Sequence, residues 1–160
     1  MKKIRITLVI AGKEDYPGCG DIIATCHEFA IVARHTSLTT PGIWQDLTAS
    51  DVVLLDERAV SQDGRDVVRH VHESFPFTRI LLIMEKTSRN KTMEALSMGI
   101  TGVMERAGVV ASVRKAIPVL YAGETWVSRA LVKSLHSQLK YADEDTLFPH
   151  AMLPPGFLKN

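Results

Sequence analysis

The feature that most constrains this chain is a run of four apolar residues, Val52 to Leu55, enclosed by Asp51 and Asp56. A short run of this kind, partly β-branched, is typical of a strand that is buried on both faces. Such strands occur mainly in parallel sheets covered by helices. Asp56 falls at the carboxyl edge of the predicted strand, which is where open α/β sheets carry their ligands and their chemistry.

The rest of the chain alternates between strand-like and helix-like segments. Beside the central strand we expect strands at 4–10, 29–33, 79–84 and 101–104, and helices at 19–29, from 40 onward, 64–74, 90–98 and 109–121. A further helix, capped by Ser128, carries the apolar stripe Leu131, Val132, Leu135 and Leu139. Strands that alternate with helices in this way predict one parallel sheet with helices on both faces.

Local signals sharpen some of these elements. Thr40 followed by Pro41 predicts a helix start, with threonine as the cap and proline at the first position. Trp44 and Phe75 fall on the expected buried faces of their helices. Gly99 follows the helix at 90–98 and is expected to close it in a left-handed conformation.

Composition excludes several classes of protein. Hydrophobic residues make up 46% of the 160 residues and charged residues 23%, as in ordinary globular proteins. The net charge of +1 gives no field that would draw the whole chain to nucleic acid or to an anionic membrane. No apolar run approaches the ~20 residues of a membrane span, and no signal peptide is evident. Cys19 and Cys26 are too few for a disulfide framework, so we expect a cytoplasmic protein.

Specific residues then match a known pattern. They are Asp51 to Asp56 with Asp63-Gly64, the segment Met98 to Val103, and Ala116-Ile117 with Ala122 to Ser128. In this order and spacing they resemble the receiver domains of response regulators, in the LuxR-type branch. The resemblance covers about residues 4 to 139. It divides the chain into a receiver-like domain at 1–124, a linker-type helix at 125–141, and a tail at 142–160 that does not resemble a helix-turn-helix.

The resemblance implies a three-layer, doubly wound, five-stranded parallel sheet of the flavodoxin-like receiver fold, with an extra C-terminal helix. In that family the aspartate that ends the third strand accepts a phosphoryl group. Mg²⁺ is held by this aspartate and by an acidic pair after the first strand, while a Ser/Thr and a Lys at the ends of the fourth and fifth strands complete the site. Phosphoryl transfer to a carboxylate gathers negative charge, so the reaction needs a metal ion and a fixed cation.

At the matching positions this chain departs from the pattern, and Asp56 alone keeps the family residue. The acidic pair falls on Ala11 and Gly12, which have no side-chain ligand for a metal. Met84 stands at the Ser/Thr position, and its thioether cannot donate a hydrogen bond. Glu85 follows it, and Arg106 stands at the Lys position with a guanidinium in place of the ammonium group.

We therefore interpret Asp56 as a retained structural acid and expect it to pair with Arg106, because a carboxylate beside a guanidinium stays ionised without Mg²⁺. Two alternatives stay open. In one, Glu14 and Asp15 replace the missing pair, Mg²⁺ is bound, and Asp56 is phosphorylated. In the other, the small residues at 11 and 12 open a pocket for a small ligand at the strand ends.

The function that the resemblance implies is protein–protein interaction in two-component signalling or transcriptional regulation, with no enzyme activity, no cofactor and no metal. Receivers dimerise and signal through their fourth helix, fifth strand and fifth helix, so we expect a homodimer on this face. Its residues here are Thr92, Ala95, Met98, Val103, Arg106, Val110 and Arg114. The leucine stripe of the last helix either packs on the domain or extends this contact. Direct nucleic-acid binding is not expected, since the tail is short and rich in proline.

Overall fold

The computed structural model describes the backbone of residues 2–12, 18–60 and 62–141, and their side chains except at 62–64, 135 and 138–141. The strands are β1 (Ile4–Val9), β2 (Phe29–His35), β3 (Val52–Asp56), β4 (Arg79–Met84) and β5 (Gly102–Glu105). The α-helices are α1 (Cys19–Ala24), α2 (Ile43–Thr48), α3 (Gln62–Ser74), α4 (Arg89–Ser97), α5 (Val109–Tyr121) and α6 (Arg129–Tyr141). Two 3₁₀ turns, η1 (Glu57–Ala59) and η2 (Arg106–Gly108), follow β3 and β5.

The strands form a single five-stranded sheet in the order β2-β1-β3-β4-β5, and all neighbouring pairs are parallel. The apolar run Val52 to Leu55 thus lies in the central strand, β3. All five of its residues are buried. Both the predicted parallel sheet and the predicted position of Asp56 at its carboxyl edge are confirmed.

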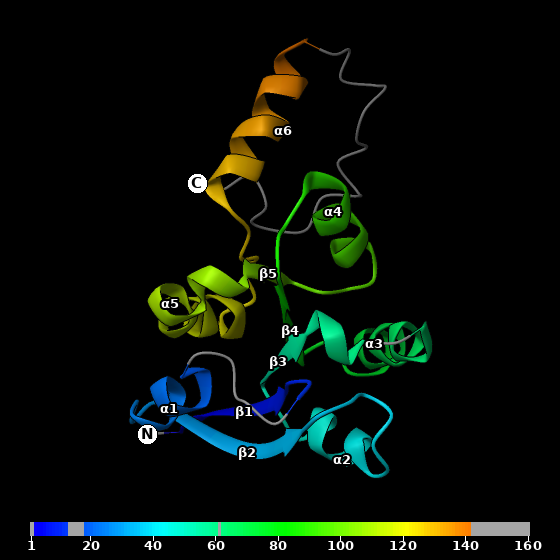
Figure 1. Cartoon of the computed structure of the whole chain (residues 1–160), viewed down its shortest axis with the longest axis vertical. Coiled ribbons are helices and arrows are strands. Elements are labelled where there is room, and N and C mark those ends of the chain that lie inside the picture. The colour runs from blue at the N-terminus through cyan, green and yellow to red at the C-terminus, as the bar shows by residue number, and fades with distance from the viewer. Residues whose placement is uncertain (1, 13–17, 61, 142–160) are drawn as a thin grey trace.

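Helices cover both faces of the sheet, which confirms the three-layer prediction. In Figure 1, α1 and α5 lie on one side of the strands, and α2, α3 and α4 lie on the other. Alternate residues of β3 divide between the two cores: Leu54 packs with the core under α1 and α5, and Leu55 packs with the core under α2, α3 and α4. Burial of this kind is worth about 2 kcal/mol per large aliphatic side chain.

The α4 helix begins and ends as the sequence predicts. Ser88 is its N-cap, and the Ser88 hydroxyl oxygen accepts a hydrogen bond of 3.2 Å from the Lys91 amide. Gly99 follows the helix with φ +96°, which confirms the predicted left-handed closure. A Cβ atom at this position would also lie 2.2 Å from Cγ of His72, so glycine is required both for conformation and for the close approach of α3.

Some local predictions are wrong. The α2 helix begins at Ile43 with Gly42 at its N-cap, so Thr40 lies outside the capping position. The Thr40 hydroxyl instead donates to the carbonyl of Ser37 at 3.0 Å. Trp44 is 36% exposed and packs edge-on against the ring of His70, with the centroids 4.8 Å apart. Phe75 is 41% exposed, because α3 ends at Ser74 and leaves it outside the buried face.

The segment that joins α5 to α6 extends the sheet beyond β5. The Trp126 amide donates to the Thr101 carbonyl at 3.0 Å, and the Val103 amide donates to the Trp126 carbonyl at 2.8 Å. These two bonds form a parallel bridge between Trp126 and Gly102. The outer edge of β5 is therefore paired at this point by the chain's own connecting segment.

The α6 helix starts on the domain. Ser128 caps it, as predicted, by accepting a hydrogen bond of 3.1 Å from the Leu131 amide. Leu131 is 8% exposed and packs against Met93, Leu96 and Val127. The first leucine of the predicted stripe thus contacts α4, whereas the side chains of Leu135 and Leu139 lie outside the described part. Residues 142–160, including Leu147, Phe148 and Phe157, also lie outside it.

In the described part of the chain, none of the helices has the length and apolar character of a bilayer span.

Candidate functional site at the carboxyl edge of the sheet

Asp56 ends β3 with its side chain 0% exposed. Its Oδ2 atom accepts a hydrogen bond of 3.1 Å from the Ala11 amide, and its Oδ1 atom accepts one of 3.1 Å from the Arg58 amide. The Arg58 guanidinium adds contacts from Nε at 3.1 Å and from Nη2 at 3.0 Å, both to Oδ2. Both carboxylate oxygens are therefore engaged by donors, one of which carries a full positive charge.

The local backbone explains why Arg58 takes this position. Asp56 is the N-cap of the 3₁₀ turn η1, with an extended φ of −78° and ψ of 131°. A tight turn that starts at an aspartate brings the residue two positions later back over the carboxylate. The Arg58 Nη2 atom also donates to the Ala11 carbonyl at 3.3 Å, so this side chain bridges the loops that follow β1 and β3.

The sequence prediction chose the wrong guanidinium for Asp56. The structure places Arg58 against the carboxylate, whereas Nη1 of Arg106 pairs with Oε2 of Glu85 at 3.3 Å. Glu85 follows β4, which lies between β3 and β5, and it meets Arg106 there. The sequence did contain a signal for Arg58, namely an arginine two residues after an aspartate that ends a strand.

Further carboxylates tie the neighbouring loops together. Oε1 of Glu57 accepts a hydrogen bond of 2.9 Å from the Glu85 amide. Oε1 of Glu105 accepts from the Thr87 amide at 3.0 Å and from the Thr87 hydroxyl at 3.1 Å. The amide bond, with the hydroxyl bond second, lowers the pKa of Glu105 below its ordinary value. These acids link the loops after β3, β4 and β5.

The described residues do not fit the Mg²⁺ ion that the family resemblance implies. Ala11 offers an amide donor rather than a carboxylate, and the oxygens of Asp56 already accept from nitrogen donors. Met84 is 4% exposed and belongs to the apolar core under α2, α3 and α4. Within residues 2–12, 18–60 and 62–141 there is no group of three or more His, Cys, Asp or Glu residues that could hold a metal. Glu14 and Asp15 lie outside the described residues, so their proposed role stays a prediction.

The predicted ligand pocket beside Ala11, Gly12 and Asp56 stays a prediction, because residues 13–17, which continue this loop, lie outside the described part. Arg58 crosses from Asp56 to the Ala11 carbonyl, whereas a Cβ atom built on Gly12 would meet no described atom within 4 Å. A separate hollow of about 190 Å³ lies near Met84 and Met98, and its walls include residues of η1, α3, β4 and α4.

The predicted interaction face is partly buried. Thr92, Ala95 and Val103 are at most 4% exposed, so a partner cannot rest on them as on an open surface. The other members are more accessible: Met98 and Arg106 are half-buried, and Val110 and Arg114 are exposed. The available part of the face is thus mainly the outer side of α5.

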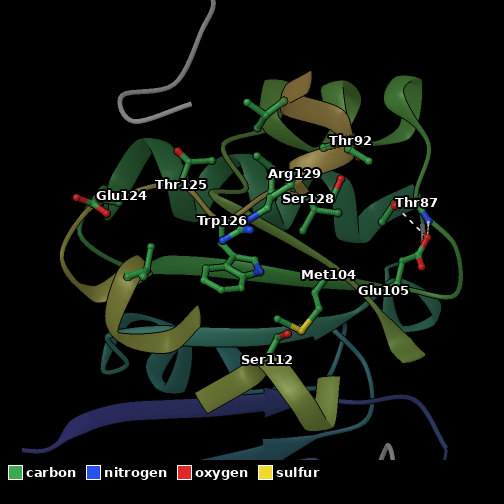
Figure 2. Close-up of a pocket in the computed structure, with 15 residues that line it drawn as sticks. Thr87, Thr92, Met104, Glu105, Ser112, Glu124, Thr125, Trp126, Ser128 and Arg129 are labelled. Carbon is green, nitrogen blue, oxygen red and sulfur yellow. Dashed lines mark hydrogen bonds between the residues drawn. The ribbon is translucent and has the colours of Figure 1, made fainter. Parts of the chain in front are cut away.

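A groove of about 950 Å³ lies in the same region, between α4, β5, α5 and the start of α6. Figure 2 shows the Trp126 ring within it, near Met104 and Ser112, with Arg129 on the side of α6. Sequence reasoning missed this feature. Its tryptophan stands in the segment after the predicted domain boundary at 124, and the bridge to β5 that positions it has no local sequence signal.

Comparisons with known proteins support the fold. No protein-family model and no curated protein sequence matches the chain. Among solved structures, a LuxR-family two-component response regulator from Aurantimonas sp. SI85-9A1 superimposes with a TM-score of 0.70 at 21% identity, covering 86% of this chain and 98% of that one.

Two structures of RcsB are also similar. The isolated REC domain of RcsB from Salmonella enterica serovar Typhimurium, in the apo form, gives a TM-score of 0.72 at 15% identity over 84% of this chain and 99% of that one. A longer RcsB response regulator from Salmonella typhimurium gives 0.71 at 14% identity, over 93% of this chain and 73% of that one. At these identities the likeness establishes the fold: the chain has the flavodoxin-like fold of receiver domains.

Proposed function

We propose that this chain is a degenerate receiver of the LuxR type that acts as a protein-interaction module in two-component signalling or transcriptional regulation, without phosphorylation of Asp56. One observation carries the proposal: the Asp56 carboxylate is fully buried and held by Arg58 and the Ala11 amide. The fold itself is that of receiver domains. The proposal includes no enzyme activity, no cofactor, no direct binding of nucleic acid, and a cytoplasmic location.

The chemistry at Asp56 explains why phosphorylation is not part of this function. Attack on a phosphoryl donor needs a carboxylate oxygen that is free to act as the nucleophile, and it needs a cation that neutralises the growing charge. Here attack requires breaking charge-assisted hydrogen bonds, each worth about 1.5–3 kcal/mol. Met84 supplies no hydroxyl that could donate a hydrogen bond to the incoming phosphoryl group.

The proposed partner is a second copy of the chain, held through the α4–β5–α5 face. The accessible side chains that favour α5 as the centre of this contact are Val110, which is 53% exposed, and Arg114. A mixed apolar and arginine surface is the composition that protein interfaces favour. Because the Asp56 site is internally neutralised, this association should not require a phosphoryl group.

Sedimentation equilibrium over a wide concentration range tests the proposal. We expect self-association by the wild-type chain, unchanged by Mg²⁺ with a small-molecule phosphodonor. Arg114→Glu should weaken the association, and Arg69→Glu, an exposed arginine on α3 away from the face, should leave it intact. A chain that is monomeric at every concentration would contradict the homodimer, and association that appears only with the phosphodonor would contradict phosphate independence.

A further inference from the structure

The groove on the β5 side combines apolar and polar walls with an aromatic floor. Trp126 is partly buried, with part of its ring packed on the core under α1 and α5. Met104 continues the floor, hydroxyl groups come from Ser112 and Ser128, and the Arg129 side chain extends from the start of α6 toward Trp126 (Figure 2). A volume of about 950 Å³ is at the upper end of the range for ligand sites, roughly 300–1,000 Å³, and the groove is open along one side. These dimensions suit a peptide segment.

We propose that this groove is the docking site for the C-terminal segment of the same chain, residues 142–160, bound without helical structure. The sequence of this segment is rich in apolar side chains: Leu147, Phe148, Met152, Leu153, Phe157 and Leu158. It also has three prolines, at 149, 154 and 155, which oppose helix formation. Proline-rich segments dock in grooves lined by aromatic side chains, as Trp126 lines this one.

The order of residues in the segment matches the geometry. The α6 helix begins at the groove and, with 13 residues, carries the chain about 20 Å away from it. An extended chain covers about 3.3 Å per residue, so roughly six residues bring it back to the start of α6. Counted from Tyr141, that return ends at Leu147, where the apolar part of the segment begins.

Charge and tethering favour the same arrangement. The residues that would run back along α6 are Asp143, Glu144 and Asp145, and α6 exposes Lys133 to meet them. Because the segment is covalently attached to α6, its effective concentration at the groove would be in the mM range, so even a weak contact would be populated. A second copy lacks this advantage, and we therefore assign the groove to the chain's own segment.

The groove adjoins the face proposed for partners. It reaches Thr92 and Val103, two buried members of that face, and leaves the exposed residues Val110 and Arg114 on α5 outside its lining. This inference does not depend on the state of Asp56.

The test uses Trp126 as a reporter. The chain has two tryptophans, so Trp44→Phe leaves Trp126 alone. In this background we compare acrylamide quenching of the full chain with that of a chain ending at Tyr141. The described cores are built from residues 4–132, so the shortened chain keeps them intact. We expect quenching to rise roughly twofold in the shortened chain, and to fall again when a peptide of residues 142–160 is added at mM concentration.

Two full-length variants in the same background locate the contact. Ala130 lines the groove and Ala111 does not; both are exposed in the first turn of a helix, where aspartate is tolerated. Ala130→Asp should raise quenching toward the shortened chain, and Ala111→Asp should not. Equal quenching in full and shortened chains, or no effect of Ala130→Asp, would overturn the proposal. Protection that grows with protein concentration would overturn it in favour of a second copy's segment.

Discussion

An aspartate paired with an arginine lies at each end of β3, but the two pairs differ in burial and in the origin of the arginine. At the amino end, Asp51 accepts hydrogen bonds from the Arg5 amide at 2.8 Å and from Nε and Nη2 of Arg5 at 3.2 and 3.0 Å. At the carboxyl end, Asp56 is held by the amides of Ala11 and Arg58 and by the Arg58 guanidinium. The side chain of Asp51 is 14% exposed, and that of Asp56 is 0% exposed.

The difference lies in where each arginine comes from. Arg5 belongs to β1, 46 positions away from Asp51, so this pair joins two strands and reports on the assembled sheet. Arg58 lies two positions after Asp56, so this pair forms within one turn. At the amino end, the arginine–aspartate pair stabilises the packing of β1 beside β3. The carboxyl end uses the same chemistry where receiver domains would place a metal and a phosphoryl group.

Of the substitutions considered at the two ends of β3, we expect the removal of Arg58 to lower stability most. Arg58→Ala removes the guanidinium that contacts the buried Asp56 carboxylate, and we expect a loss of about 3 kcal/mol in the free energy of unfolding, the low end for a broken buried pair because Arg58 is itself half exposed. Urea unfolding measures the loss. Arg58→Lys should fall between wild type and alanine, because it keeps the charge without the fork. A loss below that of Arg5→Ala would contradict the account.

Removing the amino-end arginine should cost less. Arg5 is 44% exposed, so water partly replaces it, and Arg5→Ala is expected to cost about 1 kcal/mol. Urea unfolding of this variant gives the reference for the exposed end of β3. If Arg5→Ala lowered the free energy of unfolding more than Arg58→Ala does, the expected ranking of the two pairs would be wrong.

The pH dependence of stability tests the electrostatic contribution of Asp51 at the amino end of β3. Burial alone would raise the pKa of Asp51, but the side-chain and backbone hydrogen bonds from Arg5 outweigh it and hold this pKa below the ordinary 3.8. A lowered pKa adds stability above the unfolded value, and this stability is lost as the pH falls through 3.8 toward the folded value. Urea midpoints measured between neutral and acid pH should fall less steeply in Asp51→Asn. An unchanged slope would contradict the assignment.

The smallest effect should come from Arg106. Its pair with Glu85 is solvent-exposed at the loop ends, and exposed pairs contribute about 0–1 kcal/mol, so Arg106→Ala should change stability by roughly 0.5 kcal/mol or less. Glu85→Ala is the matched control and should behave alike. A loss as large as that of Arg58→Ala would restore Arg106 as the support of Asp56.

The sheet, the order of its elements and the position of Asp56 followed from sequence, because buried strands leave apolar runs that do not depend on distant partners. Arg58 was missed as the partner of Asp56, although its place two residues after an aspartate that ends a strand was a signal, because only the 3₁₀ turn folds it back over the carboxylate. Trp126 was missed for a similar reason: its bridge to β5 is a long-range contact. Thr40 does not cap α2 because the helix begins at Ile43, three residues later, with Gly42 at the N-cap.

The most direct test of the central claim is the intact mass of the wild-type chain after incubation with Mg²⁺ and a small-molecule phosphodonor, beside Asp56→Asn and a phosphorylatable receiver as positive control. We predict that the wild-type mass stays unchanged while the control receiver gains a phosphoryl group. A gain of one phosphoryl mass on Asp56, absent from Asp56→Asn, would contradict the account. It would also support the alternative in which Glu14 and Asp15 complete a metal site.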